Sequence, residues 1–249
     1  MNILVTGGKG FLGSHLIPAL EKKGYTVRSY DLKDKQDILN IKQLSKAIAW
    51  SDVVYHLAAL TDVQESIKKP VKYFLTNGVG TLQVCKICTK LQKKLIYTST
   101  AATYNPTSSP YALSKFDGEN FVSILYPFVL LRLFNVYGEG MNKTTMIARF
   151  QKENPITIYG DGKQTRDFIY IDDVIEIMVS ALDKKWNGFV GDVGTAYEHT
   201  VLYFAKLFKK PIQFKEERKE VRKSVADIKA LRKLYKKPFK KLNIWITQQ

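Results

Sequence analysis

Tyr111 and Lys115, in the segment YALSK, are the first candidates for chemistry. We expect this segment to be helical, and residues four apart on a helix lie on the same face. A phenol with a pKa of about 10 is a poor base at neutral pH, but a neighbouring ammonium group favours the phenolate and lowers that pKa. Such a pair can remove a proton from a hydroxyl group while a nicotinamide takes hydride from the same carbon. The spacing is common by chance, so it needs support from the elements around it.

A run of hydroxyl side chains precedes this helix, at the end of the apolar segment KLIYTST. It consists of Thr98, Ser99 and Thr100. A hydroxyl at a strand end can hydrogen-bond a reacting oxygen and steady a developing alkoxide. The alternative is that these residues are present because threonine is favoured in strands.

A second candidate site lies near the start of the chain, in TGGKGFLG. Its glycines are Gly7, Gly8, Gly10 and Gly13. They follow an apolar run and precede a helical pattern. In that position glycines permit a tight turn, and the helix N-terminus offers free N–H groups to a pyrophosphate.

Asp31 ends the second apolar run, about 20 residues beyond the glycines, where dinucleotide-binding folds place an acid on the adenosine ribose. Its charge would repel a ribose 2′-phosphate, so NAD is favoured over NADP. Arg28 and Lys33 are close in sequence, which makes this a preference only. The alternative role of Asp31 is that of a turn residue.

Strand-like and helix-like segments alternate over the first half of the chain and must position these residues. Strands are expected at 2–6, 25–31, 52–59, 94–100 and 128–134, with helices at 11–24, 74–92 and 111–125. This alternation predicts an α/β fold, a doubly wound parallel sheet of the Rossmann type.

The later part of the chain predicts a small mixed C-terminal lobe. We expect an NAD-binding domain over 1–138, with a returning segment at about 167–182. Residues 139–166 and 183–249 would form the substrate-binding lobe. Ligands of such sheets bind outside the carboxyl ends of the strands.

Composition narrows the class of protein. The net charge is +16, which suits nucleic acid or a phosphorylated substrate, but no nucleic-acid module accompanies it and a lysine-rich solvated surface is favoured. Three histidines assemble no metal site, and Cys85 and Cys88 are interpreted as small buried residues on one helix face. No apolar run is long enough to cross a membrane and the start has no signal-peptide pattern, so we expect a cytoplasmic protein.

Seven motifs in order resemble the extended short-chain dehydrogenase/reductase family of nucleotide-sugar epimerases and dehydratases. They are TGGKGFLGSHL, the strand end at Asp31, DIL at 37–39, HLAA at 56–59, YALSK at 111–115, LRLFNVYG at 131–138 and YGDGKQTRDFIYIDDV at 159–174. The resemblance runs from residue 1 to about residue 235.

The resemblance implies roles for individual residues. Thr100, Tyr111 and Lys115 would be catalytic, with Ser99 the second candidate for the hydroxyl. The cofactor would contact Gly7, Gly10, Phe11, Leu12, Gly13, Asp31, Asp37, Ile38, Leu57, Ala58, Ala59 and Thr98, besides Tyr111 and Lys115. A nucleotide-sugar substrate would contact Thr61, Ser99, Asn135, Arg166 and Arg218, although surface salt bridges are the alternative for both arginines. Members are commonly homodimers through two helices, here near 74–92 and 111–125.

The residues after Thr100 bear on the reaction. Family dehydratases and decarboxylases have acidic residues there, whereas this chain has Ala101 and Ala102. An epimerase needs only oxidation, rotation and reduction of the sugar, so C4 epimerisation is the favoured activity. A nucleotide-sugar 4-reductase or dehydrogenase, or a non-catalytic NAD-binding scaffold, are the alternatives. The segment from Tyr104 to Tyr111 is shorter than in the family, which predicts a more open site.

Overall fold

The chain forms two units in a computed structural model, which describes residues 1–217, 221–240, 242 and 245. The first unit contains residues 1–133 and 175–191, and the second contains 134–174 and 192–249. The assignment of NAD binding to one unit and substrate binding to the other stays a prediction.

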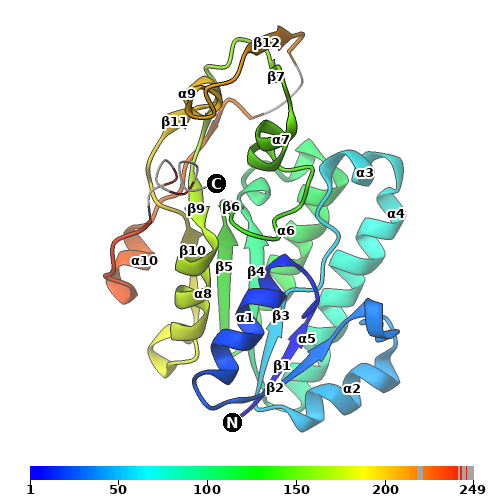
Figure 1. The fold of residues 1–249 in the computed structure, drawn as a ribbon. Coiled ribbons are helices and arrows are strands. Elements are labelled where there is room, and N and C mark those ends of the chain that lie inside the picture. Colours follow the sequence, from blue (N-terminus) through cyan, green and yellow to red (C-terminus); the bar gives the residue numbers. More distant parts are fainter. Residues whose placement is uncertain (218–220, 241, 243–244, 246–249) are drawn as a thin grey trace. The chain divides into compact units, whose positions relative to one another are not determined.

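A parallel sheet forms the centre of the first unit (Figure 1). Its strands are β1 (Asn2–Thr6), β2 (Thr26–Tyr30), β3 (Val53–His56), β4 (Lys94–Thr100), β5 (Phe128–Leu133) and β10 (Phe189–Val193). Their order is β10-β5-β4-β3-β1-β2, and β1 to β5 pair in parallel. The chain passes from β1 to β2 on one side and then from β2 to β3 on the other side of β1. Such a reversal of strand order creates the crevice where α/β sheets bind ligands.

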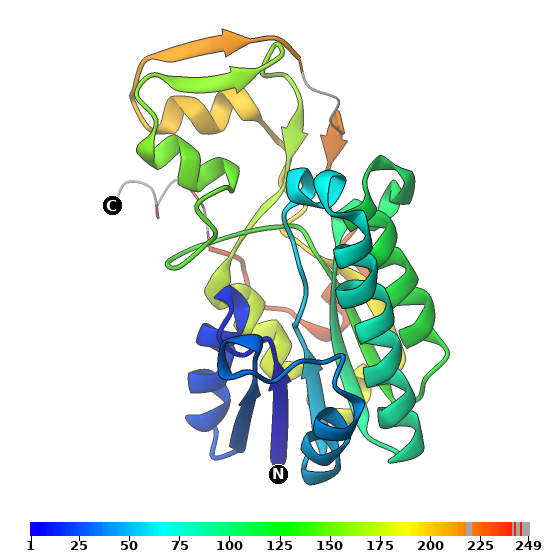
Figure 2. The same ribbon diagram turned by 90° about the vertical axis from the view of Figure 1, so that its right-hand side faces the viewer.

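Helices cover both faces of this sheet (Figures 1 and 2). On one face lie α1 (Phe11–Glu21) and α8 (Ile171–Ser180), and on the other α2 (Ile41–Trp50), α5 (Gly80–Lys90) and α6 (Pro110–Ser123). The strands are therefore buried on both sides, which explains their nearly continuous apolar sequences. The predicted Rossmann-type fold class is confirmed.

The helix expected near 74–92 contains an unforeseen feature. It starts with a short helix, α4 (Pro70–Tyr73), continues through one π-helical turn at Phe74–Val79, and runs into α5. A short helix, α3 (Val63–Lys68), precedes it. Turns of this kind are frequent at functional sites.

In the part of the second unit that the structure describes, the strands form three small sheets and three helices accompany them. β6 (Asn135–Tyr137) pairs with β9 (Phe168–Tyr170), β7 (Ile156–Tyr159) with β12 (Ile212–Lys215), and β8 (Thr165–Arg166) with both β11 (His199–Thr200) and β13 (Lys223–Ser224). The helices are α7 (Met146–Lys152), α9 (Val201–Leu207) and α10 (Lys229–Leu234). The sequence predicted a mixed lobe, and the small extra sheets agree with that.

Buried Asp167 organises the second unit. Its carboxylate is fully buried and accepts hydrogen bonds from the N–H groups of Thr195, Ala196 and Ala226 and from the Thr195 hydroxyl. Several donors are needed because an unpaired buried carboxylate would be very costly. The Asp167 side chain, directly before β9, thus connects this part of the chain to residues 195–196 and to residue 226.

Candidate active site

The glycine loop after β1 has the geometry of a phosphate-binding turn. Gly7 has a φ of +70°, and a Cβ there would lie 2.7 Å from the backbone nitrogen of Ala58. A Cβ on Gly13 would lie 2.5 Å from the carbonyl oxygen of Gly8. Neither position tolerates a side chain, so the loop stays tight and its backbone exposed to a ligand.

Helix α1 begins immediately after this loop, at Phe11. Its N-cap residue, Gly10, provides no side-chain hydrogen bond to the first turn. The first N–H groups of a helix lack intrahelical partners and carry a partial positive charge. The beginning of α1 at Phe11, Leu12 and Gly13 can therefore accept a pyrophosphate.

Asp31 follows β2 and faces the same loop. It is 8% exposed, and its two carboxylate oxygens accept hydrogen bonds from the N–H groups of Lys9 and Lys33, each at 2.9 Å. Each oxygen keeps a lone pair for a ribose hydroxyl. The fixed carboxylate fits an unphosphorylated ribose, as NAD carries.

The segments expected to flank the cofactor are also fixed in place. The Asp37 carboxylate accepts from the N–H of Leu39 at 2.9 Å, and Ile38 is buried at 5% exposure. After β3, the Leu57 N–H donates to the Thr6 carbonyl at 3.1 Å and the Ala58 N–H to the Thr6 hydroxyl at 3.3 Å. Ala59 follows them. Contacts of these residues with the cofactor stay predictions.

Thr100 and Tyr111 meet where β4 ends and α6 begins. Ser109 caps α6 by accepting from the Ala112 N–H at 3.1 Å, and Pro110 occupies the first turn. Tyr111 is 9% exposed and its hydroxyl is hydrogen-bonded to the Thr100 side chain. Burial raises the pKa of Tyr111, while the hydrogen bond to Thr100 lowers it. In the protein alone, burial therefore outweighs the lowering expected from the nearby ammonium.

Lys115 lies one turn further along α6 and is 4% exposed. Its ammonium donates to the Thr98 carbonyl at 2.7 Å and lies 4.1 Å from the centre of the Tyr97 ring. Burial lowers the pKa of Lys115 to about 7, against the opposing field of Glu119. The structure thus brings Thr98, Thr100 and the two helix residues together, and their catalytic and cofactor-binding roles stay predictions.

Four polar residues around this group, three of them buried and Arg132 half-buried, were missed from the sequence. The His56 ring lies between the hydroxyls of Thr6 and Thr81, at 2.7 and 2.9 Å, and burial lowers its pKa to about 3. From the π-helical turn, Asn77 bonds both backbone groups of Leu60, each at 2.9 Å. The other two are Glu119 and Arg132, which form an ion pair. The only signal for Glu119 was its position four residues after Lys115.

The expected substrate residues are distributed over both units. In the first unit, Thr61 is exposed, whereas Ser99 is 4% exposed and its hydroxyl donates to Glu119 at 2.5 Å. In the second unit, Asn135 donates to the Asp167 carbonyl at 2.8 Å and Arg166 to the Thr165 and Val221 carbonyls. Arg218 lies outside the described residues. Substrate contacts of all five stay predictions.

The sequence of this fold matches a known family model. The model of the NAD dependent epimerase/dehydratase family covers residues 3–194. The chain belongs to this family. It is 30% identical to a UDP-N-acetyl-alpha-D-glucosaminuronate decarboxylase of Bacillus cytotoxicus, over 80% of this chain and 76% of that protein.

Solved structures agree with membership of the epimerase/dehydratase family. Pal from Bacillus thuringiensis superposes with a TM-score of 0.92 at 27% identity, over 99% of this chain and 97% of that one. UDP-glucuronic acid 4-epimerase from Bacillus cereus, in complex with UDP-glucuronic acid and NAD, has a TM-score of 0.87 at 31% identity, over 99% and 97%. The cofactor is NAD, and the glycine loop with Asp31 fits it.

Two kinds of feature, a metal-binding cluster and a membrane-spanning helix, are absent from the described residues. Within the described ranges, no group of three or more histidine, cysteine or acidic side chains is arranged to hold a metal ion. Among the helices of the same residues, none is long and apolar enough to cross a membrane.

Proposed function

We propose that this chain epimerises the sugar of a nucleotide diphosphate sugar at C4. The observation that carries the proposal is the pairing of a complete Thr100, Tyr111 and Lys115 group with a turn, Ala101–Tyr104, that contains no carboxyl group. Elimination or decarboxylation chemistry calls for a further acid or base, and the turn offers none. The Bacillus cereus 4-epimerase at 31% identity supports the same choice.

The chain's own groups account for the proton movements. The Tyr111 phenolate removes the proton of the C4 hydroxyl, and the Thr100 hydroxyl hydrogen-bonds the same oxygen. The Lys115 ammonium favours the phenolate by its charge. NAD, when bound, takes the hydride from C4 and returns it. The 4-keto sugar turns over before reduction, so that the opposite face of C4 receives the hydride, and Tyr111 returns the proton to the C4 oxygen.

A nucleotide diphosphate needs cations, and arginine is suited to it because its guanidinium binds two oxygens at once. Arg166 and Arg218 are the proposed partners of the diphosphate, with Asn135 on the substrate backbone and Thr61 near the sugar.

A homodimer is part of the proposal. Exposed apolar side chains follow one another at helical spacing along α3, α4, the π-helical turn and α5: Ile67, Val71, Leu75, Val79 and Leu82. An apolar stripe of this kind commonly marks an interface. A cytoplasmic location is also proposed, because Cys85 and Cys88 are free thiols.

The experiment that tests the activity uses proton NMR on the anomeric signals. The purified protein is incubated with UDP-glucose, UDP-galactose, their N-acetyl forms and UDP-glucuronic acid, with and without added NAD, and Tyr111→Phe is the control. We expect interconversion of one C4 pair and a loss of about 10²–10⁴-fold in the variant. Net reduction or oxidation of the cofactor would indicate a reductase or dehydrogenase, and release of CO₂ a decarboxylase. NAD binding without any turnover would support the scaffold alternative.

A further inference from the structure

Glu119 is a buried carboxylate on the helix that carries the catalytic pair. It is 5% exposed and lies four residues after Lys115 and eight after Tyr111, on the same face of α6. A carboxylate so placed is strongly disfavoured unless charges and hydrogen bonds compensate for its lost hydration.

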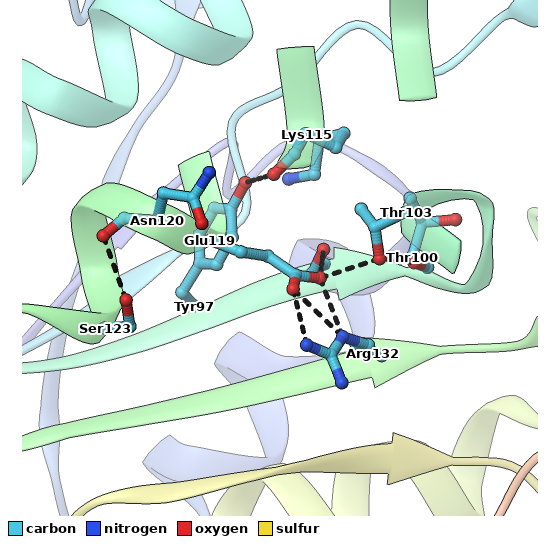
Figure 3. Close-up of polar contacts among 9 residues, drawn as sticks. Tyr97, Thr100, Thr103, Lys115, Glu119, Asn120, Ser123 and Arg132 are labelled. Atoms are coloured by element: carbon cyan, nitrogen blue, oxygen red, sulfur yellow. Dashed lines mark hydrogen bonds and ion pairs between the residues drawn. The ribbon is translucent and has the colours of Figure 1, made fainter. Parts of the chain in front are cut away.

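The compensation comes from three other segments of the first unit (Figure 3). Arg132, on β5, contacts both carboxylate oxygens of Glu119 at 2.7–3.0 Å. Ser99, in β4, donates from its hydroxyl to the Glu119 Oε1 atom at 2.5 Å. The Thr103 hydroxyl lies 2.9 Å from that same oxygen and 2.9 Å from the Thr100 carbonyl. It has one proton, so it donates to one of these two acceptors at a time.

Residues that contact Glu119 lie on both sides of Thr100 in the sequence. Ser99 precedes it and Thr103 lies in the turn that follows it, and the hydroxyl groups of both contact the Glu119 carboxylate. Arg132 also lies under the ring of Tyr104, with 5.4 Å between the guanidinium carbon and the ring centre. The end of β4, with Thr100, and the turn after it are therefore held to α6 through the Glu119 carboxylate, which the ion pair with Arg132 connects to β5.

We propose that Glu119 and Arg132 are positioning residues whose ion pair holds the Thr100 turn against α6 and thereby fixes the contact between the Thr100 and Tyr111 hydroxyls. The assignment rests on the proposed function, because it gives that contact its catalytic use. Neither residue touches the reacting atoms. They act through Thr100 on one side and through the helix on the other.

The pair has an electrostatic effect that a purely structural tie lacks. The Glu119 charge raises the pKa of Lys115 against the larger, opposite effect of burial. Removing Glu119 leaves the Arg132 charge uncompensated, which disfavours the Lys115 ammonium. Removing Arg132 leaves the Glu119 carboxylate uncompensated, which favours the Lys115 ammonium. The titratable and charged groups around Lys115 are His56 on β3, Tyr97 on β4, Tyr111 and Glu119 on α6, and Arg132 on β5.

The test compares Glu119→Gln and Arg132→Gln with wild-type protein loaded with NAD. Because a misplacement of about 1 Å costs about 10²-fold, we expect kcat to fall by about 10- to 100-fold in both variants. KM and the NAD dissociation constant should stay within about twofold, since neither residue lies in the glycine loop or near Asp31. Ser99→Ala should lower kcat less, because the ion pair remains.

Two readouts do not depend on sugar turnover. Lysine side chains labelled with ¹³C report the Lys115 titration by NMR, which should move to lower pH in Glu119→Gln and to higher pH in Arg132→Gln. Amide hydrogen exchange of residues 101–104 should become faster in both variants. Tyr55→Phe is the matched control, because it deletes a buried hydrogen bond to the Met178 carbonyl on the opposite face of the sheet. It should lower the melting temperature and change neither readout.

The outcomes separate the two proposals. If wild type turns over no nucleotide sugar while the titrations and exchange change as expected, the proposed function fails and the positioning role stands. If both variants behave like Tyr55→Phe, with unchanged kcat, the same Lys115 titration and a protected turn, the positioning role is overturned. Shifts of the Lys115 titration in the same direction in both variants would also overturn it.

Discussion

Burial is what distinguishes Tyr111 and Lys115 from an ordinary surface pair with the same spacing. It raises the pKa of the phenol and lowers that of the ammonium to about 7, so both charged forms are disfavoured in the protein alone. In the proposed function, other charges must oppose this effect for the pair to work as a base. Glu119 opposes it at Lys115, and the cationic nicotinamide of NAD would oppose it at Tyr111.

Lys115 predicts a pH dependence of stability. Its pKa falls from 10.5 to about 7 on folding, so the unfolded chain binds more protons between these values. The contribution of Lys115 to stability is therefore present above pH 10.5, declines as the pH falls, and is lost below about 7. Lys115→Met lacks this dependence. Urea unfolding without NAD should show the variant gaining stability relative to wild type from pH 9 to pH 6.5. A constant difference between the two proteins would contradict the shift.

The two cysteines are expected to be unreactive in the folded protein. Burial raises the pKa of Cys85 to about 12 and that of Cys88 also well above its usual range. The thiolate is the nucleophile, so Ellman's reagent at pH 8 should label neither residue before unfolding and both after it in urea. Rapid labelling of the native protein would show instead that α5 opens.

We expect the loop between β1 and α1 to bind the cofactor, and two glycines allow a matched test. Gly7 and Gly24 have φ values of +70° and +82°, so alanine is strained at both by about 1 kcal/mol. A Cβ at Gly24 meets nothing within 4 Å, whereas one at Gly7 collides with Ala58. Gly7→Ala should abolish NAD binding, measured by calorimetry, and Gly24→Ala should only lower the melting temperature. Equal NAD affinity in the two variants would show that the loop tolerates the shift.

Elements whose structure depends on residues close to one another in the sequence could be predicted from that sequence. β1 occupies residues 2–6 as expected, because an apolar run ends at glycines whose turn cannot be extended. The spacing of Tyr111 and Lys115 on α6 was likewise readable from helical periodicity. The π-helical turn was not, since the bonds of Asn77 reach Leu60, 17 residues away. Nor was the partner of Glu119, because sheet order brings Arg132 to it.

At the scale of the whole molecule, the apolar stripe on α3 to α5 predicts the oligomeric state. Val71 is 71% exposed near its middle. Val71→Glu should convert a dimer into a monomer in analytical ultracentrifugation, because a buried charge at an interface is costly. Phe214→Glu is the control, since Phe214 is 56% exposed in the other unit and should leave the sedimentation coefficient unchanged. A monomeric wild type would refute the predicted interface.

The first unit is built from two separate segments of the chain, 1–133 and 175–191, and this affects how it folds during synthesis on the ribosome. Its sheet ends with β10, and β10 is translated only after residues 134–174 of the second unit have emerged. Until then β5 presents an unpaired edge, and unpaired edges favour association with other chains. The nascent protein therefore contains α6 before its sheet is complete. A gene truncated at residue 133 would yield an aggregating fragment, and pausing of translation between residues 134 and 190 would prolong that exposure.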